Sequence, residues 1–72
     1  MKITTIVFKV TTDDSQKNYE KFINLLALRG YSFTVSRKDV SSACRKFFVE
    51  VDDISDSDIE YATFTLGGVE EE

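Results

Sequence analysis

The apolar residues near the start of this chain first alternate and then recur at helical spacing. This change of period most constrains what the chain can fold into. Over residues 2–11, Ile6, Phe8 and Val10 fall on one face at the period of two that a strand requires. Val7 lies on the opposite face, which favours a central strand with apolar residues on both sides. The apolar period then changes to that of a helix, so the sequence predicts a strand followed by a helix.

The helix is predicted to begin near Thr12 and to end near Arg29. Thr12, Asp13, Asp14 and Ser15 carry oxygens that can accept hydrogen bonds from the free backbone N–H groups of a first turn. Gly30 suits the left-handed conformation that follows a last turn. The apolar residues at helical spacing, which should form the buried stripe, are Tyr19, Phe22, Ile23, Leu26 and Ala27.

Two leucines of this helix lie outside the predicted stripe. Leu28 projects beside Lys17 and Lys21, and Leu25 lies at the edge of the same side. They are either isolated exposed leucines, which protein surfaces tolerate, or a second apolar contact used by a partner or by a second copy of the chain.

The second half of the chain alternates again. Residues 31–36 and 45–52 are predicted strands, joined by a polar connection over residues 37–43. The alternative for this connection is a short helix over residues 39–46, because Val40, Ala43, Cys44 and Phe47 also have helical spacing.

The last predicted strand covers residues 61–66 and follows a carboxylate-rich link over residues 52–60. In that link, Ser55 with Asp58 three residues later suggests a capping box and one or two helical turns. Two glycines end the strand. Residues 69–72 are predicted to be a frayed acidic tail after a single domain over residues 1–68.

This element order predicts an α+β fold, with a four-stranded, mainly antiparallel sheet and one main helix on one face. If the acidic link crosses over, the arrangement is a degenerate ferredoxin-like β-α-β-β-(short α)-β unit. If it does not, the last strands form a βαβββ meander. In both cases the second face of the sheet is left to water or to a partner.

Composition argues against an enzyme. The 72 residues contain no His and one Cys, so the usual general base is missing and Cys44 has no histidine to activate it. An EF-hand count from Asp52 places Ser57 where glycine is needed and Thr63 where a bidentate glutamate is needed. We therefore expect a non-enzymatic protein with no cofactor and no metal site.

Charge is divided unevenly along the chain. All nine Lys and Arg residues lie at or before Lys46, whereas residues 47–72 carry nine carboxylates and no basic residue. The candidate partner-binding acidic patch consists of Glu50, Asp52, Asp53, Asp56, Asp58 and Glu60. The leading hypothesis is a protein-binding inhibitor or regulator, of the kind phages encode, whose acidic patch mimics nucleic acid and occupies a basic surface of a larger protein.

An alternative is nucleic-acid binding. Residues 45–51, Arg-Lys-Phe-Phe-Val-Glu-Val, resemble the third-strand signature of the RNA-recognition motif, with Phe48 at the one retained stacking position. Lys46 and Val51 stand where that family has aromatic residues, and its glycine is missing. The resemblance implies binding of RNA or single-stranded DNA by Arg37, Lys38, Arg45, Lys46 and Phe48.

A third possibility is a self-associating structural domain that uses Leu25, Leu28 or the open sheet face, so both a monomer and a homodimer are compatible with the sequence. A lone Cys44 indicates a reducing compartment, and no stretch is apolar enough for a membrane span. We therefore expect a cytoplasmic protein that does not bind membranes.

Overall fold

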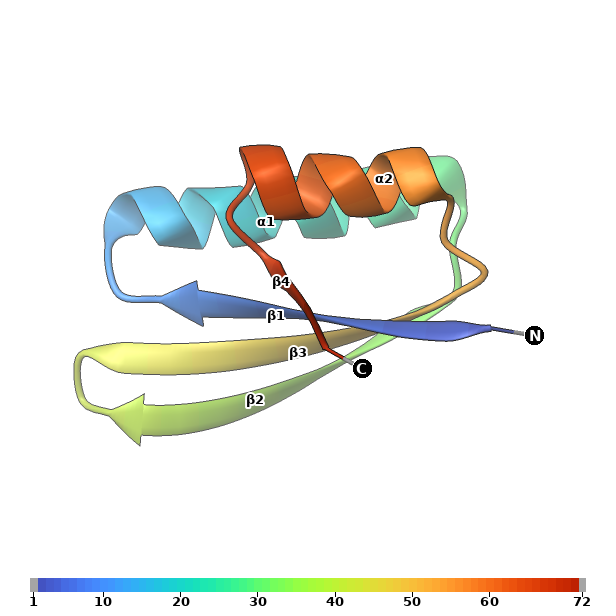
Figure 1. Cartoon of the computed structure of the whole chain (residues 1–72). Helices are drawn as coiled ribbons and strands as arrows, with labels where there is room; N and C mark the ends of the chain where they lie inside the picture. Colours follow the sequence, from blue (N-terminus) through green and yellow to red (C-terminus); the bar gives the residue numbers. More distant parts are fainter. Residues whose placement is uncertain (1, 72) are drawn as a thin grey trace.

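A computed structural model describes residues 2–71 of the chain. Two helices lie side by side on one face of a twisted sheet (Figure 1). The elements, in chain order, are β1 (Ile3–Val10), α1 (Asp13–Arg29), β2 (Phe33–Ser41), β3 (Cys44–Asp52), α2 (Asp56–Glu60), the π-helical turn η1 (Tyr61–Thr65) and β4 (Val69–Glu71). The predicted α+β class and open four-stranded antiparallel sheet are confirmed.

The β1 and α1 predictions are confirmed closely. Thr12 caps α1 by accepting a hydrogen bond from the Ser15 backbone N–H, and the Ser15 hydroxyl in turn accepts from the Thr12 backbone N–H. Gly30 ends the helix with a φ of 75°, a left-handed conformation that costs glycine little. Phe22 and Leu26 of the predicted stripe are buried, whereas Ala27 is exposed.

The β2–β3 connection differs from both predictions. Strand β2 continues to Ser41 and pairs with β3 up to Ser41 and Cys44, so residues 37–43 are mostly strand and residues 39–46 are not a helix. Pairing with β3 satisfies the backbone groups that face β3, and the position at the edge of the sheet leaves the side chains of this polar segment in water.

The prediction of a strand over residues 61–66 is wrong. This segment continues α2 as a π-helix, because Ile59, Ala62 and Leu66 recur at helical spacing and all three are buried. The Thr63 hydroxyl donates to the Ile59 carbonyl oxygen at 3.0 Å, a contact one helical turn back along the chain. Ser55 caps α2 as expected by accepting from the Asp58 backbone N–H at 3.3 Å.

Residues 69–71 form β4 rather than a frayed tail, and Glu72 lies outside the described residues. Val69 pairs with Val7 and Glu71 with Thr5, antiparallel to β1. The helical crossover returns the chain to the free edge of β1, where the ladder gives β4 its hydrogen bonds. The sheet order is therefore β2-β3-β1-β4 with every neighbouring pair antiparallel, which is the ferredoxin-like arrangement.

The core lies between the sheet and the two helices. Alternate residues of β1 and β3 supply one side, and α1, α2 and η1 supply the other. Its buried members are Ile6, Phe8, Phe22, Leu26, Val49, Val51, Ile54, Ile59, Ala62 and Leu66. Along residues 2–71, no helix is both long and apolar enough to cross a bilayer.

Candidate functional site: the open sheet face and the outer ridge

The face of the sheet away from the helices carries three rows of paired residues in its middle, and Ile3 and Asp52 form a further pair beyond them. Because paired residues of neighbouring strands point the same way, each row crosses several strands. The lysine row is Lys38, Lys46 and Lys9; the apolar row is Phe48, Val7 and Val69, with Ser36 at its β2 end; and the acidic row is Glu50 and Glu71, with Thr34 and Thr5 beside them.

The lysine row contains only part of the predicted basic set. Lys38 and Lys46 lie directly opposite each other and close to Phe48, as nucleic-acid binding would require. Arg37 and Arg45 lie on the other side of the same strands, paired with Phe47 and with Val10, respectively. The five predicted residues therefore do not form one surface.

Lys9 completes the lysine row and was missed by sequence reasoning. It pairs with Lys46 across the β1–β3 ladder. Lys9 is two residues from Val7 and therefore shares its face of β1. The sequence alone, however, does not determine how β1 and β3 pair. Only the register identifies its lysine neighbours.

Arg37 has a partner of its own on the helix side of the β2–β3 ribbon. Its Nε donates to Asp39 Oδ1 at 2.8 Å, and its Nη2 donates to Asp39 Oδ2 at 3.1 Å. This hydrogen-bonded pair lowers the pKa of the Asp39 carboxyl below its ordinary value and raises the pKa of Arg37. Both groups are exposed, so the pair orders the end of the hairpin without contributing much stability.

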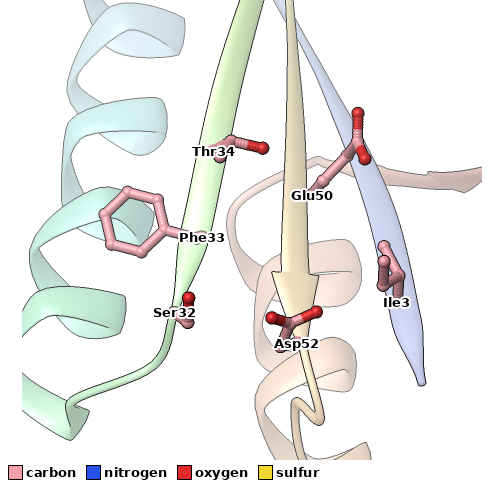
Figure 2. Close-up of a pocket in the computed structure, with 6 residues that line it drawn as sticks. All are labelled: Ile3, Ser32, Phe33, Thr34, Glu50 and Asp52. Carbon is pink, nitrogen blue, oxygen red and sulfur yellow. The ribbon is translucent and has the colours of Figure 1, made fainter. Parts of the chain in front are cut away.

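The predicted acidic patch is divided between two sides of the molecule. Glu50 and Asp52 line a shallow hollow of about 160 Å³ together with Ile3, Ser32, Phe33 and Thr34. Figure 2 shows Glu50 and Asp52 projecting from β3, while the Phe33 ring points from β2 toward α1. Asp56 and Glu60, in contrast, are exposed on α2, in the helix layer.

Asp53 lies in the turn after β3 and makes local hydrogen bonds. Its φ is 54°, in the left-handed region, and its side-chain Oδ1 accepts from the Lys2 backbone N–H at 3.0 Å. Its backbone N–H donates to the Lys2 carbonyl oxygen at 2.8 Å. The carboxylate therefore stabilises the turn where the chain leaves the sheet for α2.

Asp58, which the sequence placed in the acidic patch, is 4% exposed and so contributes little to the surface of the molecule. Its Oδ2 accepts a hydrogen bond from the Tyr31 hydroxyl at 2.7 Å, and its Oδ1 lies 3.4 Å from Arg29 Nε. Tyr31 also accepts from the Ser55 backbone N–H at 3.2 Å. This cluster joins the end of α1 to the start of α2, so the Asp58 carboxylate is structural.

The outer side of α2 and η1 carries a different combination, which we call the outer ridge: Asp56, Glu60, Tyr61 and Phe64. Tyr61 is 40% exposed and Phe64 is 85% exposed. The intervening Ile59 and Ala62 are buried, so the helix turns these four residues to solvent together. Sequence reasoning missed the two aromatics because it placed them in a strand.

The remaining candidate residues, Leu25, Leu28 and Cys44, differ in how exposed they are. Leu25 packs against the core, which limits its use in self-association, whereas Leu28 is 87% exposed. Cys44 is a free, partly buried thiol at the start of β3. Within residues 2–71, no three Asp, Glu or Cys side chains are grouped so that they could hold a metal ion.

No family model matches the chain, and no curated protein matches it. Among solved structures, the chain is similar to the de novo designed protein Ferredog-Diesel, with 17% identity and a TM-score of 0.59 over 97% of this chain and 82% of that one. It is also similar to part of prephenate dehydratase from Streptococcus mutans, with 12% identity and a TM-score of 0.61 over 96% of this chain and 39% of that one. At these identities the likeness shows the fold alone.

Proposed function

We propose that the chain is a non-enzymatic protein-binding module that presents its outer ridge to a basic surface of a larger protein. The single observation that supports this proposal is the exposed Phe64 on the same helix side as Glu60. Aromatic side chains are enriched at protein interfaces, and a rim of carboxylates speeds the approach of a basic partner. A π-helical turn such as η1 is also frequent at functional sites.

The proposal is narrower than the hypothesis drawn from charge alone. Glu50 and Asp52 lie on the open sheet face, Asp58 is buried, and Asp56 and Glu60 lie on the helix side. These carboxylates do not form the continuous line of charges that imitates a nucleic-acid backbone. The expected partner is therefore a protein with an apolar pocket beside basic residues, and inhibition or regulation of that protein is the role such a module would have.

Affinity capture from the source cells, read by mass spectrometry, tests the ridge. Phe64→Ala should weaken capture of the partner roughly 30-fold, as expected for the loss of about 2 kcal/mol at an aromatic anchor. Glu60→Gln should mainly slow association and flatten its salt dependence. Matched controls exist on α1: Leu28→Ala removes an equally exposed apolar side chain, and Glu20→Gln removes an exposed carboxylate.

Equal recovery of the same partner by wild type, Phe64→Ala and Glu60→Gln would show that the ridge is not the contact. A loss with Leu28→Ala instead would move the contact to α1. All four positions are solvent-exposed, so substitution there should change stability little. Thermal unfolding of each variant checks that it is folded like the wild type.

Nucleic-acid binding has a specific observation in its favour, which is the lysine row beside Phe48. Against it, Glu50 and Glu71 share the same face and would repel phosphates. A fluorescence polarisation titration with labelled single-stranded oligonucleotides at low salt separates the two functions. We expect no saturable binding.

A further inference from the structure

The open sheet face carries opposite charges at equal distances from its apolar row. Lys46 and Glu50 are each two residues from Phe48 on β3, which is about 6.8 Å along an extended strand. Lys9 and Thr5 flank Val7 in the same way on β1, and Glu71 extends the acidic row on β4. Across these three rows the pattern is lysine, apolar, acidic, and the Ile3–Asp52 pair lies beyond the acidic row.

The lysine row is unfavourable in an isolated chain. Lys38, Lys46 and Lys9 occupy directly opposed positions on three adjacent strands, and like charges opposite one another destabilise a sheet. Glu50, on the acidic row, is four residues from Lys46, or roughly 14 Å along the strand, too far for contact. The row therefore lacks carboxylate partners in the paired positions beside it.

We infer that the open sheet face binds a second copy of this chain, face to face, about a two-fold axis that runs along the apolar row. Rotation about this axis makes the strands of the second copy run antiparallel to those of the first. It also places the apolar row of one copy against the apolar row of the other. Phe48 then meets Phe48 of the second copy, and Val7 meets Val7. Lys46 of each copy lies opposite Glu50 of the other, so the interface contains this pair twice.

Lys9 also fits the same operation. Lys9 comes opposite Thr5 of the second copy, between its Glu50 and Glu71, which lie on the two strands that flank β1. A two-fold axis along the strands would instead place lysine on lysine. The charge pattern thus selects one axis, and that axis keeps the strands of the two sheets nearly aligned, as packed sheets commonly are.

The face also has room for interdigitating side chains and is of limited size. A hollow of about 310 Å³ next to β4 is lined by Val7, Lys9, Lys46 and Val69, among others. Four strands and three rows cover roughly 20 Å by 20 Å, or about 400 Å² per copy, which is smaller than a standard stable interface and is typical of weak association. We therefore expect a dimer of micromolar affinity. The outer ridge lies on the helix side and stays free, so this inference does not depend on the proposed function.

Sedimentation equilibrium over a range of protein concentrations tests the dimer with three variants. Lys46→Glu should place Glu opposite Glu50 of the second copy and weaken association at least tenfold, and Glu50→Lys should do the same by placing Lys opposite Lys46. The double variant Lys46→Glu/Glu50→Lys restores opposite charges within both pairs and should recover most of the wild-type affinity. Glu20→Gln on α1 is the control that should change nothing.

If Lys46 and Glu50 only stabilised the single chain, the variants would not show weakened and then recovered association. Lys46→Glu relieves the lysine row within one chain, so it should raise the thermal stability of the monomer while it weakens the dimer. A wild-type chain that stays monomeric at millimolar concentration, or a dimer that all three variants leave intact, would overturn the inference. Saturable oligonucleotide binding to a monomer, lost in Lys46→Glu and not recovered in the double variant, would overturn it in favour of nucleic acid.

Discussion

Asp58 shows how a carboxylate in an acidic run becomes a structural group. Four other carboxylates lie close to it in sequence, yet Asp58 is 4% exposed and its carboxylate accepts a hydrogen bond from Tyr31 at 2.7 Å. Arg29 approaches the same carboxylate from the last turn of α1, with its own side chain 57% exposed. A buried carboxylate must keep such donors, because an unpaired buried charge is costly.

We expect Tyr31→Phe to destabilise the fold by about 1–2 kcal/mol, since it removes a donor from a buried carboxylate and an acceptor from the Ser55 backbone N–H. Urea unfolding followed by circular dichroism measures this change. Tyr61→Phe, which makes the same chemical change at a 40% exposed side chain, is the control and should be close to neutral. Equal stability of the two variants would mean that the Tyr31 hydrogen bonds contribute nothing net.

At the scale of elements, the return from η1 to β4 depends on close packing at Gly68. A Cβ atom there would lie 2.8 Å from Ile6 Cγ2 and 2.9 Å from Phe8 Cζ, both in the core. The Gly68 backbone N–H also donates to the Ala62 carbonyl oxygen at 2.8 Å, which closes the end of η1. The absence of a side chain lets the chain pass over β1 and pair with its edge.

Gly68→Ala should therefore destabilise the protein by about 1–3 kcal/mol through overpacking, measured as a lower urea midpoint. Hydrogen exchange should show faster exchange at β4 and at the β1 edge that pairs with it. Gly67→Ala is the comparison: it meets no atom within 4 Å but has a φ of 78°, so it should cost about 1 kcal/mol from backbone strain alone. A smaller effect at Gly68 than at Gly67 would contradict the packing argument.

For the whole molecule, one sheet face is covered by helices and the other carries charge of both signs beside an apolar row. A domain of 72 residues has limited surface to bury, so association would add stability that the single core does not supply. The midpoint temperature should then depend on protein concentration, because dimer formation favours the folded state by mass action.

We expect the wild-type midpoint temperature to rise by a few degrees per hundredfold increase in concentration, and that of Lys46→Glu to stay nearly constant. Differential scanning calorimetry at several concentrations gives this dependence. The double variant Lys46→Glu/Glu50→Lys should regain the slope. A constant wild-type midpoint would indicate that folding is not coupled to association.

Local signals in the sequence determined β1, α1 and β3. The alternation in β1, the caps at Thr12 and Gly30, the apolar stripe of α1 and the β3 strand all depend on neighbours within a few residues, which is why they were predictable. The α+β class followed from their order. The free second face of the sheet followed from having too few helices to cover both sides.

Tertiary structure decided the rest, because periodicity does not fix long-range pairing. Residues 61–66 fit both a strand and a helix, and burial of Ile59, Ala62 and Leu66 against the sheet selected the helix. Register alone gathered Lys9, Lys38 and Lys46 into one row and put Arg37 and Arg45 behind it. Contact with Tyr31 took Asp58 out of the acidic surface, so the charges the sequence supplies acquired their arrangement only when the strands paired.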